Sequence, residues 1–177
     1  MNGTEPRALK RNTYEFTDGG RSCRFFFENG GSFIVDTEDF LLVSDKYWML
    51  GKRGYPVYKT SRKCKEGSKQ ICLHRLIMNF PKGDVDHING EKTDNRRCNL
   101  RVCSHQQNMF NQRLRKNNST GYIGVSYLKA AGKYEAYLHH NYRKINIGLF
   151  NTAEDAARAR DQQAQIFYGK YARLNFA

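Results

Sequence analysis

The chain has 177 residues, which is enough for one ordinary domain or two small ones. Its hydrophobic content of 39% and charged content of 27% exclude wholesale disorder. Lys and Arg outnumber Asp and Glu by 30 to 17, for a net charge of +13. This excess favours a protein that binds an anionic partner such as nucleic acid; the alternative is a generic basic protein that binds no polyanion.

The sequence also argues against membrane and secreted classes. No apolar run approaches the roughly 20 residues of a bilayer span, and residues 1–12 hold no apolar secretory core. Five cysteines, an odd number, suit a reducing cytoplasm. A zinc site of Cys64, Cys72, Cys98 and Cys103 is an alternative to buried thiols, but the chain lacks a C-x-x-C pair, so zinc is not expected.

Residues 1–12 are polar and are predicted to form a flexible N-terminus, followed by a β-hairpin region over 13–72. Apolar and aromatic runs bounded by turn residues predict strands at 14–17, 23–28, 32–35, 55–60 and 70–73, the last two joined by a turn at 65–68. Trp48, Tyr55 and Tyr58 have two interpretations, the core of a small β layer or a stacking surface for nucleic acid.

A compact segment with a distinct order of elements comes next. Residues 74–79 predict a short helix that ends before a proline. Strands predicted at 84–87 and 99–102 flank a polar loop, and Ser104 with Gln107 three residues later fits a capping box, so a second helix should begin there. The expected order is strand, loop, strand, helix.

This segment carries Asp86 beside His87, with Asn99 and then Asn108 further along. Asp86 and Asn108 offer hard oxygen ligands for one Mg²⁺ or Mn²⁺ ion. His87, with an ordinary pKa of about 6.5, is suited to take a proton from water, and the oxygen of Asn99 is suited to accept its other N–H. Each residue alone has a plain structural alternative, but the ordered set predicts phosphodiester hydrolysis.

Further basic residues surround this set. Arg96, Arg97 and Arg101 are candidates for clamping a DNA backbone. His74 is either a phosphate contact or a structural hydrogen-bonding residue, and both interpretations stay open. His105 precedes Asn108 by one helical turn, so it is an alternative metal ligand.

Residues 73–111, LHRLIMNFPKGDVDHINGEKTDNRRCNLRVCSHQQNMFN, resemble the HNH endonucleases of phage and intron-homing type. The resemblance implies a ββα-metal unit, with His87 as general base, Asn99 orienting it, and Asp86 and Asn108 as ligands of one divalent cation. It also implies a phage-encoded protein in the cytoplasm of a bacterial host. Many relatives carry histidine at the last position, where this chain has asparagine.

That nuclease unit is predicted to cover 73–112, with a basic linker over 113–120. The linker region carries Arg113, Arg115 and Lys116 and no acidic residue, so it either touches DNA or is a solvated connector.

A second unit is predicted over 121–177. Strands are expected at 122–128, 134–140 and 143–150. Apolar and polar residues alternate in the second and third strands, so one face of the sheet should be apolar and the other polar. Thr152 fits the N-cap of a helix that runs to about residue 168. Small alanines let this helix lie against the apolar face, which leaves the polar face open to a partner.

Four segments of this unit resemble the AP2 DNA-binding domain: GYIGV at 121–125, KYEAYL at 133–138, IGLFNTAEDAARA at 147–159 and GKYARLNF at 169–176. The resemblance implies that the open sheet face lies in the major groove of duplex DNA. The candidate DNA contacts are Ser126, Tyr137, His139, Lys144 and Asn146. The alternative interpretation of each one is an ordinary solvent-exposed residue of a sheet that makes no contact with DNA.

Together, these features predict an α+β protein that acts as a metal-dependent DNA endonuclease of homing type. One active site per chain predicts a monomer that nicks double-stranded DNA; double-strand cleavage would need a dimer or two successive visits by one monomer. The alternatives are a non-catalytic DNA-binding regulator and a nonspecific phage nuclease. RNA is a possible substrate, but the AP2 resemblance favours duplex DNA.

Overall fold

The computed structural model describes residues 10–60, 68–114 and 117–176. Arg115 and Lys116, two of the predicted DNA contacts, lie outside the described residues, as do most of the turn predicted at 65–68 and Cys64. No helix in the described part is long and apolar enough to cross a bilayer.

The chain divides into two compact units, Met1–Val102 and Cys103–Ala177. The first begins with an antiparallel sheet in the order β1-β2-β3, as the sequence predicted. A second antiparallel sheet has the order β4-β5-β6. The strands are β1 (Tyr14–Thr17), β2 (Ser22–Phe26), β3 (Ser32–Asp36), β4 (Met49–Leu50), β5 (Pro56–Lys59) and β6 (Gln70–Cys72).

Helix α1 (Phe40–Ser44) and strand β4 were not expected from the sequence. Both are very short, so neither shows a full hydrophobic period. Short 3₁₀ turns occur at Asp18–Gly20, Thr37–Asp39, Arg97–Asn99 and Gly169–Tyr171.

Aromatic side chains form the core of the first unit. Trp48 is fully buried, and the rings of Phe25 and Phe33 stack with centroids 5.2 Å apart. Tyr58 packs edge-on against Trp48, with centroids 5.0 Å apart. The core interpretation is therefore confirmed for Trp48.

The segment that carries Asp86 and His87 has the predicted elements. Helix α2 (Leu73–Ile77) precedes β7 (Asp84–His87), and β7 pairs with β8 (Leu100–Cys103) in a two-stranded sheet. Backbone hydrogen bonds fix the intervening loop to β3: Ile34 N–H donates to Thr93 O (2.9 Å), and Asn95 N–H donates to Ile34 O (2.8 Å). The loop is thus held by the neighbouring sheet.

Helix α3 (His105–Phe110) opens the second unit, so the last element of the predicted segment 73–112 belongs with the C-terminal residues. The predicted capping box is confirmed, because Ser104 and Gln107 each accept the other's backbone N–H. Phe110 stacks on Tyr168 with ring centroids 3.8 Å apart.

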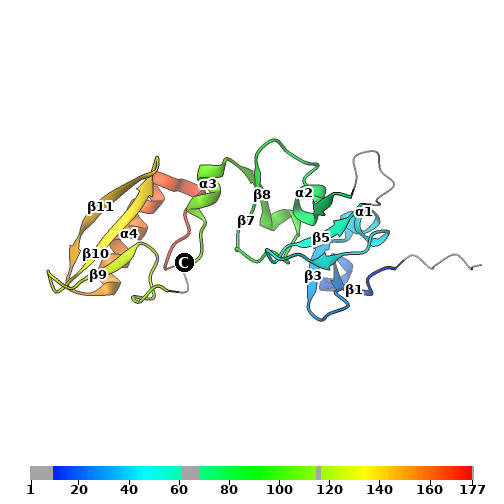
Figure 1. Ribbon diagram of the computed structural model, residues 1–177, viewed down its shortest axis with the longest axis horizontal. Helices are drawn as coiled ribbons and strands as arrows, with labels where there is room; N and C mark the ends of the chain where they lie inside the picture. Colours follow the sequence, from blue (N-terminus) through cyan, green and yellow to red (C-terminus); the bar gives the residue numbers. More distant parts are fainter. Residues whose placement is uncertain (1–9, 61–67, 115–116, 177) are drawn as a thin grey trace, which may run out of the picture. The chain divides into compact units, whose positions relative to one another are not determined.

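A three-stranded antiparallel sheet, ordered β11-β10-β9, forms the centre of the second unit, and α4 lies along one face (Figure 1). Its elements are β9 (Val125–Leu128), β10 (Lys133–His140), β11 (Arg143–Phe150) and α4 (Ala153–Tyr168). Ala156, Ala157 and Ala164 are fully buried and pack against residues of the sheet.

The first strand of this sheet starts later than predicted. Residues 122–124 are not strand, and Gly124 has a φ of +72°. A Cβ at Gly124 would lie 2.4 Å from Tyr137 O, so this position requires glycine and a local turn. The periodicity of a strand did not reveal that turn.

We expect Ser104→Ala to lower the free energy of unfolding of the second unit by about 1 kcal/mol, because it removes the side-chain acceptor for Gln107 N–H. Chemical denaturation measures the loss. Ser104→Thr keeps the hydroxyl and should retain most of the stability; equal stability of Ser104→Ala and the parent would show that the cap contributes nothing.

Candidate active site

Asp86 and His87 end strand β7, and both are buried. The carboxylate of Asp86 meets Arg101 on the paired strand β8, whose Nε and Nη2 donate to Asp86 Oδ2 at 2.9 and 2.6 Å. Because both nitrogens converge on one oxygen, Arg101 fixes the position of the carboxylate. The predicted metal ligand and a predicted DNA contact thus lie against each other.

The ring of His87 contacts a carboxamide in the loop. Its Nε2 lies 3.2 Å from Asn95 Oδ1. Asn95 Nδ2 donates to the Lys92 carbonyl oxygen at 3.2 Å, which sets the orientation of the amide. Oδ1 can only accept, so Nε2 carries the proton, and Nδ1 is the nitrogen that can take a proton from water.

The structure gives Asn99 contacts other than the predicted one with His87, and its role in orienting the ring stays a prediction. Asn99 Oδ1 accepts from Asn89 N–H (2.9 Å), and Asn99 Nδ2 donates to Asp94 O (2.8 Å). Asn99 therefore shapes the loop, while the fully buried Asn95 contacts the imidazole. Both asparagines follow His87 on one polar loop, and spacing alone does not distinguish their roles.

His74 and Tyr55 complete the surroundings of His87. The His74 ring centroid lies 5.2 Å from that of His87 and 4.7 Å from that of Tyr55. His74 is 7% exposed, and its Nδ1 is buried without a hydrogen-bond partner. His74 therefore belongs to the walls of this site, and the position of Tyr55 beside two histidines gives it a place outside the hydrophobic core.

Burial decides the charge of both histidines. Desolvation lowers the pKa of His87 below its ordinary value of 6.5. Desolvation, with the neighbouring His87, lowers the pKa of His74 to about 3. Both rings are consequently neutral at pH 7, and a neutral imidazole is the state that accepts a proton.

The other two arginines predicted to bind DNA also pair with carboxylates. Arg96 Nε and Nη2 donate to Asp94 at 2.8 Å each. Arg97 bonds to an acidic cluster formed by Asp36, Glu38 and Asp39. The Arg96–Asp94 pair lies within the loop, and the Arg97 bonds join the loop to the turn after β3; contact of these arginines with DNA stays a prediction.

That acidic cluster is the one place, within the described residues, where three His, Cys, Asp or Glu side chains come close enough to share an ion. The Arg97 guanidinium already pairs with Glu38 and Asp39 of this cluster and offsets part of its negative charge. Of the described cysteines, Cys23 and Cys103 are buried, Cys72 is half-buried and Cys98 is exposed.

The donor chemistry at Asp86 fits a hard cation, because a carboxylate oxygen is the ligand type that Mg²⁺ and Mn²⁺ take. Asn108 lies on α3 as predicted, in the second unit. Its role as a second ligand stays a prediction. His105, the alternative ligand, is exposed at the first position of α3.

The sheet of the second unit carries the predicted DNA contacts on one face. The register pairs Tyr137 with Asn146 and His139 with Lys144. Ser126 pairs with Glu135 on the other neighbouring strand. Contact of these side chains with DNA stays a prediction, as does that of the exposed Arg113.

Sequence reasoning missed Glu135 on that face. It is 7% exposed and accepts hydrogen bonds from Lys144 Nζ (2.7 Å) and Ser126 Oγ (3.2 Å). Lys144 Nζ also lies 4.4 Å from the Tyr137 ring centroid. A buried carboxylate thus holds two of the predicted DNA contacts in place.

Comparisons with known proteins fit this geometry. Residues 73–110 match the family model described as HNH endonuclease. Over 149 residues the chain is 32% identical to a protein of Acanthamoeba polyphaga mimivirus named "Uncharacterized HNH endonuclease L560", which covers 80% of this chain and 73% of that protein. The chain belongs to the HNH endonuclease family.

The C-terminal region has a second likeness. It is 41% identical over 64 residues to the ethylene-responsive transcription factor RAP2-11 of Arabidopsis thaliana, which covers 35% of this chain and 25% of that factor. A 61-residue match to the AP2-like ethylene-responsive transcription factor TOE2 of the same plant is 34% identical and covers 34% of this chain and 13% of that factor. The likeness to these plant factors is therefore partial.

Replacing Asn95 with aspartate should test its contact with His87. A carboxylate beside the ring favours the imidazolium, so the acid limb of the pH–rate profile should move to higher pH. Asn95→Leu, which cannot accept the hydrogen bond, should lower the cleavage rate at least about tenfold. Asn99→Leu should mainly lower stability; a shifted acid limb in that variant, with none in Asn95→Asp, would contradict the assignment.

The buried His74 should make the first unit lose stability in acid. The unfolded chain binds a proton at this residue below pH 6.5, whereas the folded chain binds it only near pH 3. Stability from this group is complete above pH 6.5 and declines as pH falls toward 3. Unfolding free energies at pH 7 and pH 5 should differ less for His74→Phe than for the parent; equal differences would contradict a neutral buried His74.

Proposed function

We propose that this protein is a metal-dependent DNA endonuclease of homing type that nicks duplex DNA, with His87 as the general base. One observation carries the proposal: a buried, neutral imidazole, oriented by Asn95, directly follows the carboxylate of Asp86. Neither a structural histidine nor a simple DNA-binding surface requires that combination.

His87 would take a proton from the attacking water through Nδ1, because Nε2 is committed to Asn95. Asn95 and the walls made by Tyr55 and His74 keep the ring in one orientation as it becomes charged. The hydrogen bond to Asn95 also favours the protonated ring, which opposes part of the cost of burial. General-base catalysis of this kind contributes about 10²- to 10⁴-fold to a rate.

Asp86 would hold one divalent cation, with Asn108 as the proposed second ligand, and Arg101 would keep the Asp86 carboxylate in place. When bound, Mg²⁺ or Mn²⁺ supplies positive charge to the scissile phosphate and to the leaving oxygen. Two protein oxygens suit these hard ions better than zinc, which prefers nitrogen and sulfur ligands.

Double-stranded DNA is the proposed partner. The net charge of +13 supports binding to a polyanion, and the partial likeness to AP2-type factors supports a role for the second unit in holding the duplex. One set of Asp86 and His87 per chain supports nicking by a monomer. The homing type, a phage origin and a bacterial cytoplasm rest on the sequence resemblance.

Incubation with supercoiled plasmid and Mg²⁺ or Mn²⁺ tests this function. The parent should convert the plasmid to open circles, whereas His87→Ala should be at least about 10²-fold slower and bind DNA with nearly unchanged affinity. Gln165→Ala, which alters an exposed position of α4 with no proposed role in cleavage, is the control and should nick like the parent. Undiminished nicking by His87→Ala would refute the proposed base.

A further inference from the structure

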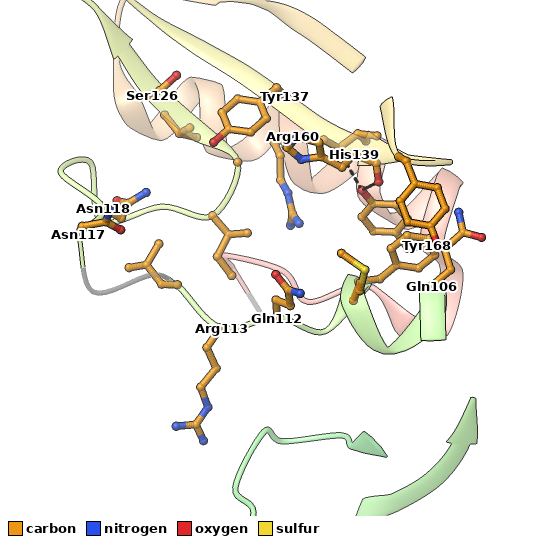
Figure 2. A pocket seen from close by; sticks show the side chains of 18 of the residues that line it. Gln106, Gln112, Arg113, Asn117, Asn118, Ser126, Tyr137, His139, Arg160 and Tyr168 are labelled. Carbon is orange, nitrogen blue, oxygen red and sulfur yellow. Dashed lines mark hydrogen bonds between the residues drawn. The ribbon is translucent and has the colours of Figure 1, made fainter. Parts of the chain in front are cut away.

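The second unit contains a pocket that the proposed nuclease chemistry does not use. Its volume is ≈ 530 Å³, within the range of roughly 300–1,000 Å³ that holds small-molecule ligands. Residues of α3 and of the segment after it form one wall, and residues of β10 and α4 form another (Figure 2).

A buried arginine points into this pocket. Arg160 on α4 is only 4% exposed, and Figure 2 shows its side chain reaching into the space, with Gln112 on the opposite wall. Its Nη1 donates to Asp161 Oδ1 at 3.0 Å and to the Arg173 carbonyl oxygen. Its Nε is buried and has no hydrogen-bond partner.

An unsatisfied donor on a buried guanidinium is costly, and native proteins rarely leave one. The absence of a side chain at Gly124 keeps the space beside Arg160 Nε open, because a Cβ at that position would lie only 3.1 Å from this nitrogen. A ligand oxygen in the pocket would supply the missing acceptor.

The charge of the walls selects an anion. The described lining residues include Arg113 and Arg160 and no aspartate or glutamate; Asp161, outside this lining, pairs with Nη1 of Arg160, and Nε of Arg160 stays without an acceptor. The oxygen that Arg160 Nε lacks is therefore expected to come from a negatively charged group such as a phosphate.

The remaining walls suit a nucleobase. Tyr137 and Tyr142 offer aromatic rings, and rings of this kind stack on bases whatever their sequence. Carboxamides such as those of Gln112 and Asn117 can donate to and accept from the edge of a base. A phosphate alone would leave most of the pocket unfilled.

We propose that this pocket binds a nucleoside monophosphate unit, with its phosphate at Arg160 and its base against the aromatic wall. The unit is either a free nucleotide or an unpaired nucleotide of a DNA strand, since both present the same chemistry. The pocket shares Arg113, Ser126, Tyr137 and His139 with the predicted duplex contacts, so ligand binding has to be measured directly and not through nicking.

Calorimetric titration of the full-length protein with dAMP tests the free nucleotide. Titration with a duplex that carries one bulged 2-aminopurine, compared with the fully paired duplex, tests the nucleotide within DNA. Saturable binding of dAMP identifies a free ligand, and tighter binding of the bulged duplex than of the paired one identifies a DNA-derived ligand. Absence of both effects would overturn the proposal.

Two variants locate the binding. Gln112→Glu places a negative charge in the pocket at an exposed position, and Gln165→Glu adds the same charge on α4 at an exposed position that does not line the pocket. Gln112→Glu should weaken dAMP binding, or the preference for the bulged duplex, about tenfold or more, while Gln165→Glu should not. Equal effects of the two variants would overturn the site.

Arg160→Lys keeps the charge beside Asp161 but removes Nε, so it should weaken the same interaction by about tenfold to hundredfold. If this variant does not fold, the Gln112 and Gln165 pair still decides the outcome. Nucleotide binding is measured here without any cleavage, and nicking by the parent and by His87→Ala is measured separately, so failure of this site and failure of the nuclease are distinguishable.

Discussion

The hydrogen bond between Asn95 and His87 decides which nitrogen of the imidazole can act as a base. It requires the loop between β7 and β8 to hold a fixed shape, and that shape depends on β3, whose Ile34 bonds to the loop backbone on both sides of Asp94. Burial then keeps the ring neutral. The N-terminal sheet β1-β2-β3, which contains Ile34, therefore supports the proposed catalytic residues.

Positive charge in this protein is partly committed to its own structure. Arg96, Arg97 and Arg101 each pair with carboxylates in the first unit, and Lys144 pairs with Glu135 in the second. Binding to DNA would therefore exchange some internal pairs for phosphates, and the net charge overstates the number of available contacts. The proposed affinity should come mainly from cations outside these pairs.

Sequence patterns predicted much of the fold, because hairpin turns, the Ser104 capping box and the alanine face of α4 are local signals. They did not predict α1 and β4, which are too short to show periodicity. They also indicated Asn99 as the partner of His87, because Asn99 is the asparagine that matches the motif of the HNH endonucleases. Which asparagine meets the ring depends on how Ile34 holds the loop, a long-range contact that sequence spacing does not contain.

The most direct test of the central claim is ¹⁵N NMR of the His87 imidazole in the full-length protein at pH 7. A neutral ring with its proton on Nε2 and an unprotonated Nδ1 is the predicted result, since Nε2 faces the acceptor oxygen of Asn95. A proton on Nδ1 of a neutral ring, or a doubly protonated ring at this pH, would contradict the assignment of His87 as a base held ready by Asn95.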